Sequence, residues 1–293
     1  MKVFVTGGTG FVGGHVIDEL HRQGHDVRAL VHRRRPSAFG GVEQVEGDVM
    51  CPESFEGAMT GCEAVVHLVG IIREFPSRGI TFERMHVRAT GNVLAAAAQA
   101  RVGRFLHMSA LGTRQGAVSA YHGTKYRAEE LVRASGLCYT IFRPSLIFGP
   151  KDGFVNMLAG QLRYTPVMPV IGTGAYRLQP IHAGDVARCF ALALGLPETV
   201  GGCYELCGDR RLTYVELLDE IAAAMGRPAP FKPRVPLAPM RLLISLLQGF
   251  PLFPITRDQL QMLIEESICS GRWKEVFGFE PKDFTAGIRE YIS

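Results

Sequence analysis

Residues 6–13 read Thr-Gly-Gly-Thr-Gly-Phe-Val-Gly and directly follow the apolar stretch Met-Lys-Val-Phe-Val of residues 1–5. This order predicts a short buried strand, a glycine turn and then a helix with Val12, Val16 and Leu20 on its apolar face. Glycines let the backbone turn tightly and approach a pyrophosphate, and the helix N-terminus offers unpaired N–H groups to the anion. Because strand and helix flank the glycines, the segment predicts a dinucleotide-phosphate site rather than a glycine turn that binds nothing.

The overall composition is that of a folded globular protein. The chain has 293 residues, of which 47% are hydrophobic and 20% charged, and its net charge is +4. The basic triplet at residues 33–35 is too short to predict binding of nucleic acid.

Seven cysteines without a recognisable framework predict a reducing compartment, and we interpret Cys203 and Cys207 as core cysteines. With no signal peptide, no apolar run long enough to span a bilayer and no metal-ligand spacing, we expect a cytoplasmic protein without a metal site.

Strand-like and helix-like segments alternate through the first half of the chain. Strands are expected at 2–6, 26–32, 42–47, 63–69, 103–109 and 138–143, and helices at 11–24, 52–60, 80–101 and 118–135. This alternation predicts an α/β fold, namely a Rossmann-type doubly wound parallel sheet covered by helices on both faces. We assign residues 1–150 to this dinucleotide-binding domain, to which a helix at 184–196 is expected to return. The proline-rich residues 151–293 are expected to form a smaller, mixed, substrate-capping region.

A second motif, Tyr-His-Gly-Thr-Lys at residues 121–125, lies on a predicted helix. Tyr121 and Lys125 are four residues apart and therefore share one helix face. A lysine ammonium beside a phenol favours the phenolate, so we expect Lys125 to lower the pKa of Tyr121. The tyrosine could then act as general acid or base towards a carbonyl or alcohol, while the lysine could also hydrogen-bond a ribose. The spacing also occurs in ordinary surface pairs, but the position after the fifth expected strand, which ends near Ser109, favours catalysis.

Together, the glycine turn, the Tyr-x-x-x-Lys helix and Thr-Ile-Phe-Arg-Pro-Ser-Leu-Ile-Phe-Gly-Pro at 140–150 resemble the short-chain dehydrogenase/reductase superfamily. Pro-Ile-His-Ala-Gly-Asp-Val-Ala at 180–187 resembles its extended branch, the NAD-dependent epimerases and dehydratases. The resemblance extends to about residue 225. Within it, residues 65–72 and the C-terminal pattern resemble an atypical subgroup related to the nucleotide-binding accessory subunit of mitochondrial complex I.

The resemblance implies a dinucleotide site assembled from several segments. It implies that the pyrophosphate contacts Gly7, Thr9, Gly10, Phe11, Val12 and Gly13. It implies that Asp48 and Val49 contact the adenine. It implies that Leu68, Val69 and Gly70 lie beside the ribose. The segment with Pro144, Ser145 and Ile147 is implied to approach the nicotinamide. Tyr121 and Lys125 match the catalytic pair and also contact the cofactor, and Ser109 is implied as a weaker oxyanion or substrate contact.

Three positions depart from the pattern that the resemblance implies. Ala110 occupies a position that often holds a catalytic hydroxyl in the extended branch, and His86 replaces the asparagine of the catalytic tetrad. Leu178 stands where nucleotide-sugar enzymes have a phosphate-binding arginine, and Arg177, one step away, would face the other side of a strand. These departures weaken the case for a sugar-nucleotide epimerase or dehydratase. They leave two alternatives, an oxidoreductase and a cofactor-binding accessory or sensor protein with little turnover.

The end of the second expected strand bears on the choice between NAD and NADP. An NAD site usually places Asp or Glu about 20 residues beyond the glycines, but this strand ends Val-His-Arg-Arg-Arg at 31–35. Guanidinium groups bind a 2′-phosphate through two parallel hydrogen bonds. We therefore predict NADP(H) in preference to NAD(H), with Arg33 as the main contact and His32 or Arg34 assisting. The alternative is a solvated basic loop.

Four further polar side chains are expected to have structural roles, and two further segments have an unusual composition. We interpret His67, His107, His182 and Asp185 as structural. Residues 71–79 are both apolar and basic and are expected to border the substrate. Residues 237–253 are almost wholly apolar, and we expect a helix that caps the core; the alternative is a surface for peripheral membrane contact, an apolar substrate such as a quinone, or a partner protein. The expected ligand is a small molecule, bound by a monomer or homodimer without a transmembrane segment.

Overall fold

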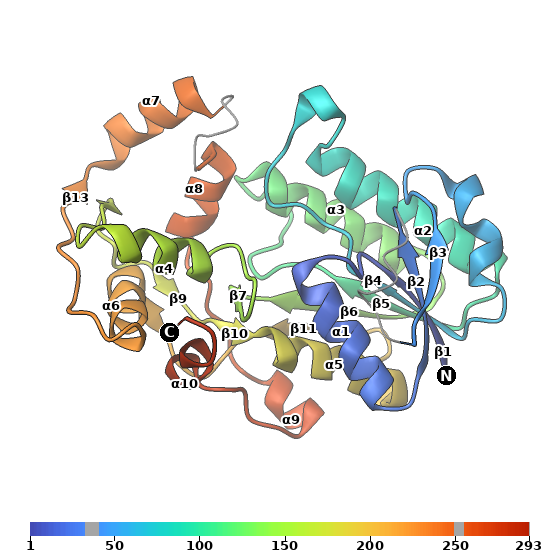
Figure 1. Ribbon diagram of the computed structural model, residues 1–293. Coiled ribbons are helices and arrows are strands. Elements are labelled where there is room, and N and C mark those ends of the chain that lie inside the picture. Colours follow the sequence, from blue (N-terminus) through green and yellow to red (C-terminus); the bar gives the residue numbers. More distant parts are fainter. Residues whose placement is uncertain (33–40, 249–254, 293) are drawn as a thin grey trace.

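A parallel sheet forms the centre of the molecule (Figure 1). The computed structural model describes residues 1–32, 41–248 and 255–292. The seven strands of the sheet are ordered β11-β6-β5-β4-β1-β2-β3, and they are β1 (Lys2–Thr6), β2 (Asp26–Val31), β3 (Glu43–Glu46), β4 (Ala64–His67), β5 (Arg104–Met108), β6 (Cys138–Pro144) and β11 (Cys203–Leu206). The order reverses between β1 and β4, and the crevice beyond the carboxyl ends of such neighbouring strands is where open parallel sheets bind ligands.

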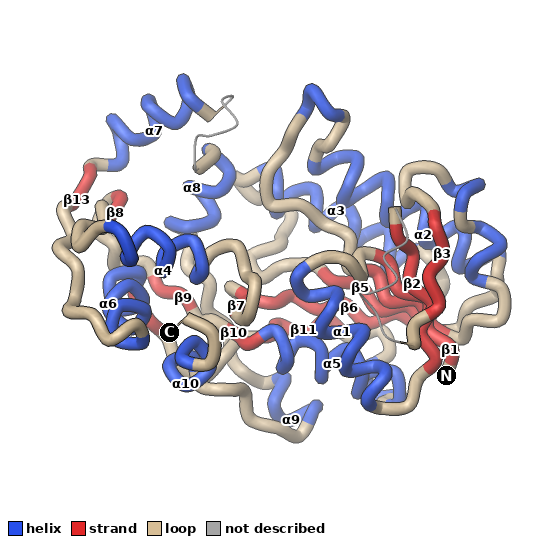
Figure 2. Tube along the Cα trace, in the orientation of Figure 1, coloured by secondary structure: helices blue, strands red, loops and turns tan. Residues whose placement is uncertain are grey.

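Helices cover both faces of the sheet, which confirms the predicted doubly wound fold (Figure 2). On one face α1 (Phe11–Arg22) and α5 (Ala183–Gly195) pack on residues such as Val5 and Val66. On the other face α2 (Ala89–Gln99) and α3 (Ala120–Ala134) pack on residues such as Phe4 and Phe105. Successive strand residues point to opposite faces, and both faces are buried at the centre of the sheet, so the central strands β1 and β4 are mostly apolar.

Two of the expected helices take other forms. Residues 52–60 make two short 3₁₀ helices, η1 (Pro52–Ser54) and η2 (Glu56–Met59), and residues 80–101 begin with a π-helical turn, η4 (Glu83–Arg88), that continues into α2. The apolar periodicity indicates a helix but does not distinguish these hydrogen-bonding patterns. A π-helical turn is rare and is often found at functional sites, and this one carries His86.

The C-terminal part builds a second, smaller core beside the carboxyl ends of the strands. Its helices are α4 (Val155–Tyr164), α6 (Tyr214–Ala224), α7 (Leu237–Leu247), α8 (Arg257–Ile264), α9 (Trp273–Phe277) and α10 (Phe284–Arg289). Three strand pairs accompany them: β7 (Ile147–Phe148) with β10 (Ile181–His182), β8 (Val170–Ile171) with β13 (Arg234–Val235), and β9 (Arg177–Leu178) with β12 (Leu212–Thr213). This core joins Leu158, Leu217 and Phe284 from α4, α6 and α10. None of the described helices is long and apolar enough to span a bilayer.

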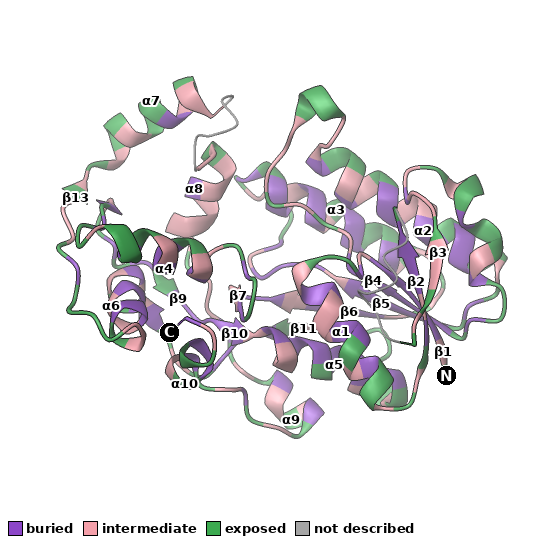
Figure 3. Cartoon of the chain, in the orientation of Figure 1, coloured by how far each residue is buried: buried purple, intermediate pink, exposed green. Residues whose placement is uncertain are grey.

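The expectation that residues 237–253 cap the core is wrong for α7. Of the residues in this helix only Ile244 is buried, and Figure 3 shows that most of its surface is exposed or half-buried. The helix stands apart from the sheet and contacts α8 (Figure 1). Its low polarity is therefore not explained by burial in this chain. Residues 249–254, the end of the same apolar stretch, lie outside the described residues.

The cysteine pattern also differs from the expectation. Cys207 and Cys269, separated by 62 positions in the sequence, form a disulfide. This bond links the end of β11 to the segment between α8 and α9. Cys203, which we interpreted as a core cysteine, is exposed. The pairing was missed because the two partners approach only through the tertiary fold, which the spacing of cysteines along the chain does not reveal.

Candidate active site

The glycine turn packs directly against the end of β4. Gly7 has a φ of 78°, a left-handed conformation that favours glycine. A Cβ atom on Gly7 would lie 2.8 Å from the Leu68 carbonyl carbon and 2.9 Å from the Val69 nitrogen. A Cβ atom on Gly13 would lie 2.7 Å from the Gly8 Cα and closer still to the Gly7 carbonyl oxygen. The turn therefore has no room for side chains at Gly7 and Gly13, and it brings the predicted pyrophosphate and ribose segments together.

The N-terminus of α1 is open to an anion. Its N-cap is Gly10, and no side chain caps the helix. The Gly10 N–H donates to the Gly7 carbonyl at 3.0 Å, whereas the first-turn N–H groups that follow have no acceptor within an α-helix. Thr9 and Gly10 are exposed, and Val12 is buried beneath them in the core. A glycine cradle at an uncapped, positive helix end fits a dinucleotide pyrophosphate.

The predicted adenine segment lies at the adjacent end of β3. The Asp48 carboxylate accepts from the Met50 N–H at 2.8 Å, and the Val49 carbonyl accepts from the Asn92 side chain at 2.8 Å. His32 is exposed at the end of β2. The predicted NADP contacts Arg33 and Arg34 lie outside the described residues.

The predicted nicotinamide segment follows β6. The Pro144 carbonyl accepts from the Leu111 N–H at 2.9 Å, and the Ser145 hydroxyl donates to the Gln179 carbonyl at 2.5 Å. Ile147 pairs with Ile181 between β7 and β10. These bonds fix the backbone of the segment across the junction between the sheet and the C-terminal core, and they leave the Ser145 hydroxyl occupied as a donor.

Lys125 connects the helix α3 to the ends of β4 and β5. It is only 2% exposed, and its Nζ donates to the Met108 carbonyl at 3.0 Å. A Cβ atom on Gly70 would lie 3.0 Å from this Nζ, so glycine leaves the space that the ammonium needs. Burial lowers the pKa of Lys125 to about 8, although the charge of Glu129 opposes this shift. The structure thus brings Lys125 and the predicted ribose segment into contact.

Tyr121 lies in a small apolar cluster with Phe82 and Ala110. Its ring meets the rings of Phe82 and His86 edge-on, with centroids 5.8 and 5.3 Å away. Burial raises the pKa of Tyr121 to about 12. The expectation that Lys125 lowers this pKa is wrong for this arrangement, because burial disfavours the phenolate and the Lys125 ammonium is held by the Met108 carbonyl. The residues Tyr121 and Ala110 are nevertheless neighbours, as the resemblance implies.

The Ser109 hydroxyl is directed into a buried ion-pair network. It donates to the Glu129 carboxylate at 2.6 Å, and the same carboxylate pairs with Arg143 at 2.6 Å and Arg133 at 2.9 Å. Glu129 and Ser109 are both almost fully buried. In this arrangement the Ser109 O–H cannot also donate to a substrate oxygen, which leaves Tyr121 as the hydroxyl donor of the three predicted catalytic residues.

His86 holds three elements of the site together. Its Nδ1 is 2.9 Å from the Thr124 hydroxyl, and its Nε2 is 3.0 Å from the Ile71 carbonyl and 3.2 Å from the Ile71 nitrogen. Burial and the charge of Lys125 lower its pKa to about 2, so the ring is neutral. His86, which stands where the resemblance implies the asparagine of the catalytic tetrad, therefore fixes the loop after β4 to α3. Thr124 was missed, although it lies within the quoted motif.

Helix α8 covers the Tyr121 cluster, and the sequence analysis did not identify it. The Asp258 carboxylate accepts from the Ala120 N–H at 2.8 Å at the start of α3, and Glu265 pairs with Arg114 at 3.2 Å. Met262 packs against the cluster of Phe82, Ala110 and Tyr121. A local signal for α8 is the capping box formed by Thr256 and Gln259. Nothing in that pattern indicates that this helix closes over residues more than a hundred positions away.

The other predicted structural side chains have the expected roles. The His182 ring caps α5 by accepting from the Gly184 N–H at 3.1 Å, and Asp185 accepts from the Lys282 N–H at 2.8 Å. His67 lies between the hydroxyls of Thr6 at 2.7 Å and Thr90 at 3.0 Å. His107 stacks on His67 with ring centroids 5.5 Å apart, and neither of its ring nitrogens has a hydrogen-bond partner among the described residues.

These buried histidines predict acid lability. Burial lowers the pKa of His67 to about 3, and burial together with His67 and Lys125 holds that of His107 well below 6.5. The folded chain then binds fewer protons than the unfolded chain as pH falls below 6.5, so the free energy of unfolding decreases from pH 6.5 towards the folded values. The slope is at most about 1.4 kcal/mol per pH unit for each histidine.

We expect His107→Leu to be at least as stable as the wild type at pH 7.5 and more stable by about 1–2 kcal/mol at pH 5.5. The substitution removes two unpaired buried nitrogens and one group that must remain neutral. Urea unfolding followed by circular dichroism at both pH values measures the difference. His21→Leu, at an exposed position, controls for the loss of an imidazole. An equal effect of His107→Leu at both pH values would contradict the proton linkage.

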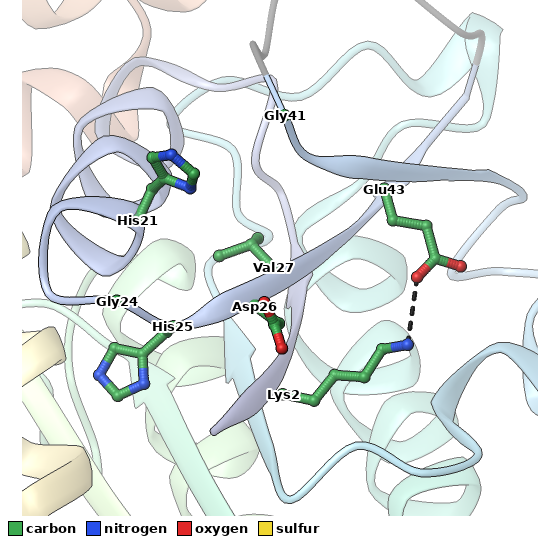
Figure 4. A pocket seen from close by; sticks show the side chains of 8 residues that line it. All are labelled: Lys2, His21, Gly24, His25, Asp26, Val27, Gly41 and Glu43. Carbon is green, nitrogen blue, oxygen red and sulfur yellow. Dashed lines mark ion pairs between the residues drawn. The ribbon is translucent and has the colours of Figure 1, made fainter.

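A separate hollow lies at the opposite end of the sheet (Figure 4). It is lined by residues at the amino ends of β1, β2 and β3, including His25, Asp26 and the Lys2–Glu43 ion pair at 3.2 Å. Ligands of open parallel sheets bind at the carboxyl ends, so this hollow does not belong to the dinucleotide site. The described residues also contain no cluster of three His, Cys, Asp or Glu side chains that could hold a metal ion.

Known proteins match most of the chain. The model of the NAD-dependent epimerase/dehydratase family matches residues 3–207. A ceramide reductase of Caulobacter vibrioides is 32% identical over 238 residues, which are 80% of this chain and 72% of that protein. Subunit 9 of the mitochondrial NADH dehydrogenase 1 alpha subcomplex of Dictyostelium discoideum is 29% identical, and the match spans 74% of this chain but only 62% of that subunit.

Solved structures match the whole chain. The UDP-glucose 4-epimerase of Thermotoga maritima, solved with UDP-glucose, superposes with a TM-score of 0.78. The alignment covers 100% of this chain and 97% of that one at 20% identity. At this level of identity the match supports the fold alone.

Proposed function

The chain belongs to the NAD-dependent epimerase/dehydratase family, the extended branch of the nicotinamide-dinucleotide-binding short-chain dehydrogenases/reductases, and we propose that it is an NADP(H)-dependent oxidoreductase acting on a carbonyl or alcohol. One observation carries the proposal: Lys125 fits against Gly70, beside the segment that contacts the glycine turn, and Tyr121 stands one helical turn away from it. The proximity of this phenol to the predicted dinucleotide segments supports the proposal.

In this proposal the bound cofactor supplies or accepts the hydride, and the protein supplies the proton. Tyr121, with its pKa raised by burial to about 12, is protonated at neutral pH and is suited to donate its phenolic proton to a carbonyl oxygen. Lys125, whose Nζ lies against Gly70, would hydrogen-bond the ribose of the cofactor.

The surroundings of Tyr121 support an apolar substrate. Phe82, Ala110 and Met262 line its side of the site, and Ile71 packs against the same cluster. The relative named as a ceramide reductase acts on a lipid, which agrees with this lining. A sugar nucleotide is disfavoured, because Leu178 is buried in the C-terminal core and Arg177 pairs with Glu266 at 2.7 Å on the surface.

The oxidoreductase is tested by turnover of the full chain with a panel of long-chain, aromatic and short polar ketones. With NADPH deuterated on the transferred position, an enzyme yields deuterated alcohols, with rates highest for apolar ketones. Micromolar binding of NADPH without labelled product from any ketone would instead support an accessory or sensor protein. That second function is favoured by Ala110, His86 and the engaged Ser109, and by the relatives that are complex I subunits.

We expect Arg33→Ala to weaken NADPH binding about 10-fold to 100-fold and to leave NADH binding unchanged, because a charge-assisted hydrogen bond to a phosphate contributes roughly 1.5–3 kcal/mol. Calorimetric titration of both dinucleotides into each variant measures this. Arg163→Ala, which removes an exposed arginine from α4, is the control. Equal affinities of the wild type for NADPH and NADH would contradict the proposed preference.

A further inference from the structure

Helix α7 presents leucines to solvent in a folded chain. Leu242, Leu243 and Leu246 are 63%, 44% and 68% exposed. Residues three and four positions apart lie on one face of a helix, so these leucines form a continuous apolar stripe on the side of α7 opposite to the buried Ile244. Phe231, in the segment that leads to α7, is 70% exposed. An apolar surface of this kind on a folded chain marks an interaction site.

The charged residues in the segment that carries this stripe are all basic. Residues 221–257 contain no Asp or Glu but include five basic residues, namely Arg227, Lys232, Arg234, Arg241 and Arg257. Arg234, Arg241 and Arg257 are exposed, and none of these guanidinium groups forms an ion pair with a described residue. Lys232, in contrast, pairs with Asp219. Among the described residues, three exposed arginines on α7 or on the segments that flank it in the sequence therefore have no acidic partner.

Two acidic side chains in and after the neighbouring helix α8 pair with the body of the protein. Asp258, at the start of α8, accepts from Ala120, and Glu265, after α8, pairs with Arg114. The loop after β4 extends the exposed apolar surface, because Ile72 is 57% exposed and Arg73 donates to the Gln248 carbonyl at the end of α7. The surface thus combines exposed aliphatic side chains with exposed arginines, whereas the acidic Glu74 accepts from the Phe82 N–H and Asp219 pairs with Lys232.

We propose that α7 docks on the surface of an anionic lipid bilayer. Helices that lie in a membrane interface bury an apolar stripe at the level of the acyl chains, while arginines beside it reach the headgroups. Anionic lipids attract each such cation. A protein partner would have to match the same stripe with acidic residues, whereas an anionic bilayer supplies apolar and anionic contacts without specific pairing. Docking requires no turnover, so it stands independently of the proposed reaction.

Docking also has a consequence for access to the site. Helix α7 contacts α8, and Met262 of α8 packs over the Tyr121 cluster. A bilayer bound at α7 therefore lies next to the helix that covers this cluster. A lipid-like substrate could then pass from the bilayer to the site without entering bulk water.

Co-sedimentation with vesicles tests the proposal on the full chain. We expect the wild type to bind vesicles of phosphatidylcholine with phosphatidylglycerol at low salt, and to bind pure phosphatidylcholine much more weakly. Arg234→Gln combined with Arg241→Gln should lower the partition coefficient about five-fold for each arginine. Leu242→Asp combined with Leu246→Asp should abolish binding. Val200→Asp, at a position 44% exposed between α5 and β11, is the matched control and should bind like the wild type.

Fluorescence provides a second readout that does not depend on lost binding. The chain has one tryptophan, and this residue, Trp273, is 2% exposed. In Leu246→Trp the added indole should shift its emission to the blue with anionic vesicles, while the wild-type emission stays constant. Absence of vesicle binding by the wild type at low salt, or binding that survives the paired Leu→Asp substitutions in a folded variant, would overturn the proposal. A concentration-dependent dimer that these substitutions dissociate, without vesicle binding, would identify a second copy of the chain as the occupant instead.

Discussion

Gly13→Ala is expected to abolish dinucleotide binding, raising the dissociation constants of both NADPH and NADH more than about 100-fold. A Cβ atom on Gly13 would overlap the Gly7 carbonyl oxygen and lie 2.7 Å from the Gly8 Cα. Both are backbone atoms, so no side chain can move aside, and the turn itself must open. An opened turn no longer holds its N–H groups towards one phosphate position. Fluorescence titration of each dinucleotide measures the loss.

The neighbouring residue is a matched control for this substitution. Gly14 lies on the same helix, and no atom comes within 4 Å of a Cβ built on it. Gly14→Ala should bind both dinucleotides like the wild type and should raise the free energy of unfolding by about 0.5–1 kcal/mol, because alanine loses less backbone entropy in a helix. If folded Gly13→Ala binds as tightly as Gly14→Ala, the phosphate site lies elsewhere.

Tyr121→Phe is expected to lower kcat about 100-fold to 10,000-fold while the dissociation constant of NADPH changes little. The ring remains in place against Phe82 and His86, so packing and the position of α8 are retained. Only the phenolic proton is lost, and in the arrangement described Ser109 cannot replace it, because its hydroxyl donates to Glu129. Single-turnover measurements with a reactive ketone separate the chemical step from substrate binding and product release.

Tyr126→Phe is the corresponding control, because Tyr126 lies on the same helix and also loses one hydroxyl. It should retain the wild-type rate. Equal rates for Tyr121→Phe and the wild type would show that another group supplies the proton. A parallel loss of NADPH affinity in Tyr121→Phe would show that the hydroxyl serves cofactor binding instead.

The extent to which the sequence predicted this site depended on how local each feature is. The strand, glycine turn and first helix are adjacent in the chain, so their packing against Leu68 and Val69 follows from a few residues in order. The alternation of apolar segments likewise predicted the sheet. The pKa of Tyr121 was predicted in the wrong direction, because charge proximity is visible in the motif whereas burial under Phe82 and Met262 is not.

Features built from distant segments could not be predicted. Helix α8 is held beside Tyr121 by Asp258, which accepts from the Ala120 N–H, and by Met262, which packs on the Tyr121 cluster. The sequence around these two residues does not indicate which part of the chain they contact. The exposure of α7 could not be predicted for the same reason, because the sequence of an apolar helix does not show whether other parts of the chain cover it. His86 was identified only as a departure from a pattern. Its bonds to Ile71 and Thr124 depend on a π-helical turn that apolar periodicity does not reveal.

The Cys207–Cys269 bond makes a closed covalent ring of the chain that contains α6, α7 and α8. A protease that cuts once within this ring therefore leaves two fragments joined through sulfur, and they separate only after reduction. The disulfide also holds together the two ends of the segment that carries α7, at Cys207 and Cys269. This helix can therefore detach from the rest of the protein only as part of a loop with joined ends. Such anchoring limits the entropy gained by detachment and keeps α7 next to α8.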